Sequence, residues 1–197
     1  MFSLRKPTRE IINNYLEEQS KKPFSYAETG ALQTGYPKGY VHVNRSVLLG
    51  KGEQTFLKGK EAITHWKMND LGWVYPSPES SFPIEVGQVF ATQTWSLGLW
   101  LLNPGKILYV IDESDEQQAR YGFGFGTLPG HPMSGEECFL VTWDKQTDEV
   151  QYSLRSFSFP KHLLSFLGYP YVFLMQKRFG RDSLRKMQEY CRSLEKK

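Results

Sequence analysis

Apolar residues recur at helical spacing near both ends of the chain. Residues 8–20 carry a short apolar stripe behind Thr8, a suitable N-cap, and therefore predict an amphipathic helix. Towards the C-terminus we expect a short helix over residues 160–166 and a long one from Pro170 to about Leu194, because proline suits a first helical turn. The stripe of the long helix consists of Val172, Met175, Phe179, Met187, Tyr190 and Leu194.

The segment between these helices opens with a strand and a further helix. Residues 40–49 are rich in Val and Leu and predict a strand, and residues 53–68 carry apolar residues on one helical face. Gly50 and Gly52 join the two, but no Gly-Lys-Ser or Gly-Lys-Thr occurs there, so they indicate a tight turn and not a phosphate-binding loop. Residues 71–83 contain three prolines and predict an irregular connection.

Strand patterns separated by short turns fill residues 84–159 and predict an antiparallel meander. Leu97–Leu102 suits a hairpin strand that is buried on both faces, and an exposed loop that touches a membrane is the alternative. Pro104 and Gly105 follow at the central positions of a predicted type II turn.

The centre of the meander is a strand in which aromatic and glycine residues alternate. Tyr121, Phe123 and Phe125 fall on one face, and the glycines at 122, 124 and 126 fall on the other. Glycines let an antiparallel sheet bend sharply. We expect the aromatic face to turn towards the C-terminal helix, and the glycine face to be the outer side, bare or covered by another element such as the N-terminal segment.

One arrangement buries every apolar face of these elements. It is a curved antiparallel sheet wrapped around the long C-terminal helix, a helix-grip fold of the α+β class. The 197 residues suit a single domain, in which residues 1–39 add an N-terminal helix and loop to a core of residues 40–197.

Composition excludes several classes of protein. The net charge of +3 argues against a nucleic-acid binder, and no apolar run is long enough for a transmembrane helix. No signal-peptide pattern opens the chain, and Cys138 and Cys191 show no metal-site spacing, so we expect a cytoplasmic protein with both thiols in its core. The oligomeric state is left open by the sequence.

Three titratable residues follow the glycine strand closely. His131 lies in a Pro-Gly-His-Pro turn, and Glu136 and Glu137 open the next strand. An imidazole and a carboxylate can act as an acid–base pair, so these three are the tentative catalytic candidates, while a metal site would need further ligands. The alternatives are ligand recognition, or a structural histidine held by a carboxylate.

Aromatic side chains on the meander strands could line an apolar cavity or fill a solid core. Arg155 could pair with a ligand carboxylate, or it could be exposed or paired with one of the two glutamates. Gln176 and Ser183 interrupt the apolar stripe of the last helix and could face a cavity, or Ser183 could bond to its own helix. The candidate ligand-binding residues are Trp95, Trp100, Tyr109, Phe123, Phe125, His131, Glu137, Tyr152, Arg155, Gln176 and Ser183.

Several motifs resemble a family of uncharacterised bacterial and plant proteins known only as a domain of unknown function. The most specific is Gly126-Thr127-Leu128-x-Gly130-His131 followed by Gly135-Glu136-Glu137, and others are Leu71-Gly72-Trp73, Ser158-x-Pro160 and Gly168-Tyr169-Pro170. The resemblance covers nearly the whole chain, and the element order is similar to that of the START/Bet v 1-like superfamily. It implies a helix-grip fold that can hold a cavity, and it implies no activity.

We therefore expect a non-enzymatic protein that binds a small, largely apolar ligand without a cofactor or metal. One alternative is an enzyme of cyclase or hydrolase type, in which His131 acts with Glu136 or Glu137. The other is an interaction module that uses the basic helix face formed by Arg178, Arg181 and Arg185, a face that is more often simply solvated.

Overall fold

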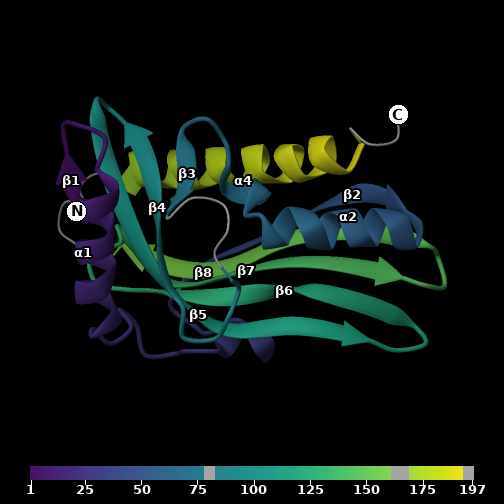
Figure 1. The fold of residues 1–197 in the computed structure, drawn as a ribbon. Helices are drawn as coiled ribbons and strands as arrows, with labels where there is room; N and C mark the ends of the chain where they lie inside the picture. Colours follow the sequence, from purple (N-terminus) through teal and green to yellow (C-terminus); the bar gives the residue numbers. More distant parts are fainter. Residues whose placement is uncertain (78–82, 161–168, 193–197) are drawn as a thin grey trace.

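The computed structural model describes residues 1–77, 83–160 and 169–192, and the short helix expected before Pro170 lies outside them. One antiparallel sheet forms the body of the protein, with strand order β2-β8-β7-β6-β5-β4-β3 and the short β1 paired with β5 (Figure 1). The strands are β1 (Phe2–Ser3), β2 (Val41–Lys51), β3 (Val74–Ser77), β4 (Val89–Ser96), β5 (Leu99–Ser114), β6 (Gln118–Thr127), β7 (Met133–Asp144) and β8 (Glu149–Pro160).

Helices α2 (Gly52–Thr64) and α4 (Tyr169–Arg192) lie on one face of this sheet, and the loop that follows α1 (Arg9–Ser20) passes along the other face (Figure 1). The first helix starts after Thr8, whose side chain accepts a hydrogen bond from the Ile11 N–H, as the sequence predicts. This arrangement confirms the helix-grip fold. The helices are α1 (Arg9–Ser20), α2 (Gly52–Thr64) and α4 (Tyr169–Arg192), with 3₁₀ turns η1 (Ala31–Gln33) and η2 (Lys67–Asn69).

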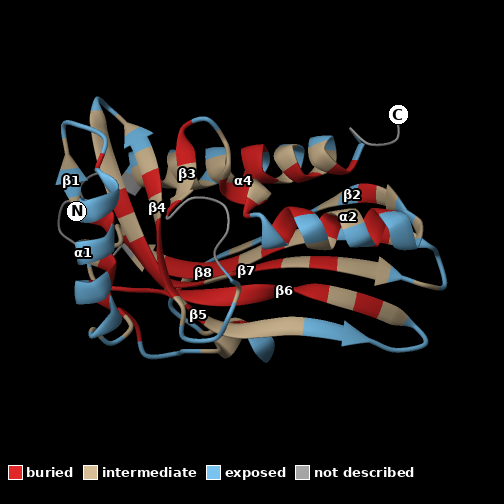
Figure 2. Ribbon diagram, viewed as in Figure 1, coloured by how far each residue is buried: buried red, intermediate tan, exposed pale blue. Residues whose placement is uncertain are grey.

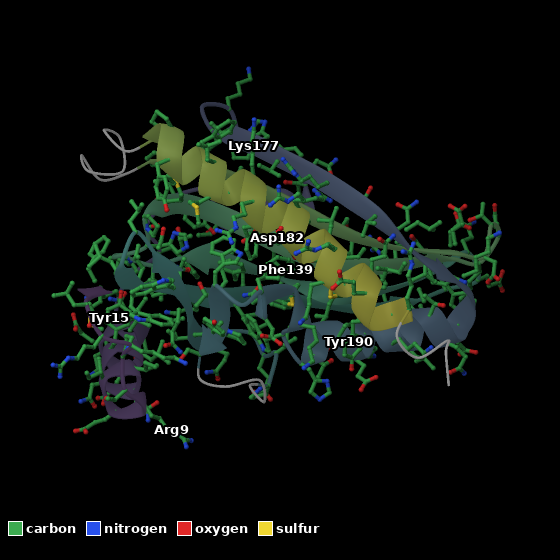
Figure 3. The ribbon with its side chains drawn as sticks, turned by 90° about the horizontal axis from the view of Figure 1, so that it is seen from above. Arg9, Tyr15, Phe139, Lys177, Asp182 and Tyr190 are labelled. Atoms are coloured by element: carbon green, nitrogen blue, oxygen red, sulfur yellow. The ribbon has the colours of Figure 1, made fainter. Side chains whose placement is uncertain are left out.

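The core lies between the sheet and the two helices that cover it, where the central strands are mostly buried (Figure 2). Phe123 and Phe139 are fully buried and pack edge to face at 5.6 Å. Phe139 also packs against Phe179 of α4, at 6.3 Å between ring centroids. Seen from above, α4 lies across the sheet, with Asp182 near its middle (Figure 3). The aromatic face of β6 is therefore turned towards the C-terminal helix, as predicted.

The glycine face of β6 is the outer side of the sheet, and it is covered. A Cβ atom on Gly126 would lie 2.4 Å from the hydroxyl of Tyr26, which belongs to the N-terminal segment. A Cβ atom on Gly124 would lie 2.1 Å from the ring of Tyr109 on β5. Of the two predicted options, the covered face is the one that occurs.

Three predictions about the strands are wrong. Leu97–Leu102 is not a strand buried on both faces, because Leu97 lies in a turn and is 79% exposed and β5 begins at Leu99. No turn occurs at Pro104, because β5 runs straight through it and the hairpin turn lies at Leu97-Gly98. Proline is tolerated there because the neighbour of β5 changes at this point: β1 pairs as far as Leu101, and β6 begins to pair at Gly105. The connection 71–83 also contains β3, a border strand that pairs with β4 and includes a proline.

Two smaller expectations agree with the structure. Cys138 and Cys191 are free and buried. Within the described ranges, no helix combines the length and the apolar character needed to cross a membrane.

Candidate functional site

A cavity of about 220 Å³ lies between the inner face of the sheet and the first half of α4. Strands from both halves of the sheet contribute to its wall, together with α4, η2 and the turn that carries His131. The wall is mostly apolar, and its apolar members include Val43, Trp73, Val74, Phe90, Leu101, Phe125, Met133, Leu154, Val172, Met175 and Phe179.

A row of side chains crosses the sheet side of the cavity. The strand register places Phe125 opposite Glu137, and Glu137 opposite Ser156. Ser156 in turn lies opposite Val43 of β2. Residues directly opposite each other on neighbouring strands share a face. The carboxyl group of Glu137 therefore stands near the middle of the inner face, between apolar side chains.

The carboxyl group of Glu137 has no hydrogen-bond or ion-pair partner among the described residues. Its side chain keeps some accessible surface because it faces the cavity. Burial raises the pKa of Glu137 to about 8, because removal from water disfavours the charged form. At neutral pH the group is therefore mostly protonated, and it offers the cavity one O–H donor and one carbonyl acceptor.

Further polar groups line the same space. The Gln176 side chain donates to the hydroxyl of Ser158, at 3.1 Å. Asn103 donates to the hydroxyl of Thr94 at 2.9 Å, but its Oδ1 is buried with no partner in the described chain. Asn69 Oδ1 is also buried and has no hydrogen-bond partner in the described chain. The cavity thus combines an apolar body with a few polar groups that have hydrogen-bonding capacity to spare.

His131 also lines the cavity, but no carboxylate among the described residues is hydrogen-bonded to it. Its Nδ1 lies 3.1 Å from the Met133 N–H nitrogen and 2.8 Å from the Met133 carbonyl oxygen. Burial lowers the pKa of His131 to about 4, so the ring is neutral at neutral pH. The backbone of its own turn therefore fixes this side chain, and the predicted acid–base pair with Glu136 or Glu137 is not formed.

The side chain of Glu136 points to the opposite face of the sheet. It accepts hydrogen bonds from the Gly30 N–H at 2.7 Å, from Tyr109 Oη at 3.1 Å and from Tyr26 Oη at 3.3 Å. Burial raises the pKa of Glu136, and these donors oppose the rise. These hydrogen bonds hold the N-terminal segment against the outer face of the sheet.

Only part of the predicted ligand-binding set lines the cavity, namely Phe125, His131, Glu137 and Gln176. Tyr152 and Ser183 share a hydrogen bond of 3.0 Å and are both buried, and Tyr152 belongs to the hydrophobic core cluster. Arg155 is on the outer face and donates to the Leu32 carbonyl at 2.7 Å. The remaining four, which also lie outside the cavity wall, are Trp95, Trp100, Tyr109 and Phe123.

The basic face of α4 is built around one buried carboxylate. Arg181 lies 3.1 Å from Asp182, Arg178 lies 3.4 Å away and Arg185 lies 3.9 Å away. Trp73 also donates to Asp182 through its indole N–H, at 3.1 Å, while the Arg178 guanidinium lies over the Trp73 ring. Asp182 thus partly neutralises the three arginines, and together with Arg178 it holds Trp73, the residue before β3, against α4.

The sequence did not single out several cavity residues. Ser156 and Ser158 continue a face of β8 on which Tyr152 and Leu154 are core residues. This change from large apolar to small polar side chains at a period of two could have indicated where the solid core ends. Asn69 lies in a 3₁₀ turn and gave no such signal. No group of three or more His, Cys, Asp or Glu side chains suited to a metal ion occurs within the described ranges.

Comparison with known proteins gives a family match. The family described as "Domain of unknown function (DUF1990)" matches residues 25–186. A UPF0548 protein of Arabidopsis thaliana is 40% identical over 148 residues, which cover 74% of this chain and 70% of the relative. A UPF0548 protein of Deinococcus radiodurans is 33% identical and covers 94% of this chain and 96% of its own length.

Solved structures resemble this chain in fold at low sequence identity. A hypothetical protein of Helicobacter pylori matches with a TM-score of 0.53 at 12% identity, over 80% of this chain and 95% of its own. Ara h 8.0201 matches with a TM-score of 0.50 at 11% identity, over 79% of this chain and 99% of its own. These matches support the Bet v 1-like architecture and carry no information on activity.

Proposed function

We propose that this chain, which belongs to the DUF1990 family of unknown function, is a binding protein for a small and largely apolar ligand. One observation carries the proposal: a mostly apolar cavity contains the carboxyl group of Glu137, which has no partner in the described chain. Binding pockets typically combine apolar walls with a small number of polar groups that orient the ligand.

The size of the cavity limits the size of the ligand. An apolar cavity of about 150 Å³ in another protein accommodates benzene. The cavity of about 220 Å³ in this chain should therefore take a compact molecule of on the order of ten non-hydrogen atoms. A single ring system with one or two polar substituents fits this volume.

The polar groups define where such substituents would lie. The protonated Glu137 can donate to a carbonyl or ether oxygen of the ligand, and the unpartnered Oδ1 atoms of Asn69 and Asn103 can accept from a ligand hydroxyl or amine. A buried group without a partner costs stability, and a ligand that supplies the partner recovers that cost. A ligand without polar groups should therefore bind more weakly than one of the same size that carries them.

Binding is favoured over acid–base catalysis by the geometry of His131. A general base needs to be oriented towards the proton that it removes, and in known triads a third group orients it. Here the backbone of Met133 contacts Nδ1, and neither neighbouring carboxylate contacts the ring.

Native mass spectrometry of the protein purified from its own source tests the proposal. We expect a bound small molecule on the wild-type protein and none on Ser156→Leu, which fills the cavity from β8. Ser153→Leu is the matched control, because Ser153 is on the same strand but on the outer face, opposite Leu140. If the wild-type protein carries no ligand and a panel of single-ring compounds gives no thermal shift, the proposal is wrong.

A further inference from the structure

Exposed apolar side chains gather at one end of the molecule. Of the ten large hydrophobic side chains that are exposed in the described chain, six belong to three short segments: residues 1–6, residues 94–101 and the start of α4. We call these six side chains the rim. They are Phe2, Leu4, Trp95, Leu97, Tyr171 and Leu174.

These three segments meet beside the part of the cavity wall that Ser96, Leu101 and Tyr171 form. β1 pairs with β5, with Phe2 opposite Leu101. The hydroxyl of Ser96 is hydrogen-bonded to that of Tyr171, which joins the β4–β5 hairpin to α4. Leu101, Ser96 and Tyr171 all line the cavity. Figure 1 shows β1, the tip of the β4–β5 hairpin and the start of α4 at the same end of the molecule.

The turn at the tip of the β4–β5 hairpin contains a residue type that its backbone conformation disfavours. Leu97 and Gly98 form a two-residue turn in which both residues have positive φ, 51° and 78°. Such turns favour Asn-Gly, because a leucine in the left-handed region is strained. Leu97 is also 79% exposed, so it does not gain stability by burial in this chain. Local stability therefore does not account for an exposed leucine at this position.

The charges on the same three segments are all positive. Residues 1–6, 94–101 and 169–178 contain four Lys or Arg residues and no Asp or Glu. Arg178 forms an ion pair with Asp182, but Arg5, Lys6 and Lys177 form no ion pair within the described part of the chain. The Lys6 ammonium lies 5.6 Å from the centre of the Trp100 ring, beside Trp95.

We propose that the rim docks this protein on the surface of a bilayer that contains anionic lipid, with the cavity wall at Ser96, Leu101 and Tyr171 on the side of the bilayer. Leucine and aromatic side chains flanked by Lys and Arg are the composition of segments that lie in a membrane interface. The flanking cations are attracted by the negative potential of anionic headgroups. A protein partner would need a surface of complementary shape for the protruding hairpin tip. A lipid interface needs no such shape, and its anionic headgroups match the positive charge of the rim segments, so lipid is the better match.

Vesicle sedimentation with the full chain tests the proposal. We expect the wild-type protein to sediment with phosphatidylcholine vesicles that contain phosphatidylserine, less with phosphatidylcholine alone, and less at high salt. Leu97→Asn places the preferred residue in the turn, so its melting temperature should equal or exceed that of wild type. Its vesicle affinity should nevertheless fall by on the order of tenfold, because an inserted leucine side chain is lost.

Matched variants separate the parts of the argument. Leu174→Gln should weaken vesicle binding as Leu97→Asn does, and Leu57→Gln, an exposed leucine on α2 outside the rim, should not. Lys6→Glu with Lys177→Glu should remove the preference for phosphatidylserine. The proposal is wrong if wild type ignores both kinds of vesicle, or if Leu97→Asn binds as wild type does. Loss of self-association in Leu97→Asn without vesicle binding by wild type would assign the rim to a second copy instead. Ligand binding in the cavity is measured separately, so either proposal can fail alone.

Discussion

Two consecutive glutamates of β7 illustrate how much one position matters. Glu136 faces outwards and accepts three hydrogen bonds, whereas Glu137 faces the cavity and accepts none from the described residues. Because side chains alternate along a strand, neighbours in sequence are placed in different environments. The first residue therefore contributes to the structure, and the second is available to a ligand.

The titration of Glu137 should be visible in protein stability. Its folded-state pKa of about 8 lies above the ordinary value of 4.5, so the folded protein keeps a proton that the unfolded chain loses. The contribution of Glu137 is thus fully present below pH 4.5 and is lost as the pH rises to about 8. The free energy of unfolding should fall by about 1.4 kcal/mol per pH unit over this window. Glu137→Gln should remove this fall.

His131 complicates the measurement in a predictable way. Its folded-state pKa of about 4 lies below 6.5, so stability should rise with pH between these values and offset the Glu137 effect in the wild-type protein. Chemical denaturation from pH 4 to pH 9 should therefore show a flat wild-type region up to about pH 6.5, followed by a fall. Parallel curves for wild type and Glu137→Gln would show that Glu137 is not protonated in the folded state.

At the scale of elements, β6 depends on a different residue type for each face. Its aromatic side chains fill the space below α4, and its glycines admit Tyr109 and the N-terminal segment against the outer face. The period of two was readable in the sequence because glycine and aromatic residues alternate strictly. The sequence did not predict that β5 continues through Pro104-Gly105, because these two residues have the local pattern of a turn. A strand is possible there because the neighbour of β5 changes from β1 to β6, which only the tertiary structure shows.

Substitutions on the two faces of β6 should both destabilise, for opposite reasons. Gly124→Val should lower the free energy of unfolding by about 1–3 kcal/mol, because the new side chain overlaps the Tyr109 ring. Phe123→Ala should lower it by about 3–5 kcal/mol through the cavity that it leaves. Thermal and urea melts measure both. A neutral Gly124→Val would mean that Tyr109 can leave the outer face at little cost.

At the scale of the whole molecule, the N-terminal segment is attached to the outer face of the sheet through Glu136 of β7. The sequence placed an extension of residues 1–39 next to the core, and it predicted the fold because each amphipathic element has one clear apolar face. It named Glu137 and Gln176 as ligand-binding candidates but missed Asn69 and Asn103, and it could not show that these residues of four separate elements share one cavity wall. Their proximity depends on register and on the position of α4, which no local pattern specifies.

Removal of Glu136 should release this N-terminal segment. Glu136→Ala leaves the Gly30 N–H and two tyrosine hydroxyls without their acceptor, and each buried unsatisfied donor costs about 1–3 kcal/mol. We expect a lower melting temperature and faster hydrogen exchange in residues 24–36. Glu137→Ala is the control, because its carboxyl group bonds to none of the described residues. Unchanged exchange in residues 24–36 would show that packing alone holds the segment.

The strand order makes β2 and β3 the edge strands of the sheet, and this has a consequence for solubility. Unpaired borders can recruit strands from other copies and start aggregation. β3 is only four residues long and contains Pro76, which cannot donate to a new neighbour. On β2, the carbonyls of Val43 and Leu48 accept side-chain hydrogen bonds from Tyr36 and Gln188, and the pairing of β2 is irregular between Leu48 and Gly50. Both edge strands are therefore poor templates, so the sheet should resist the addition of strands from other copies at either edge.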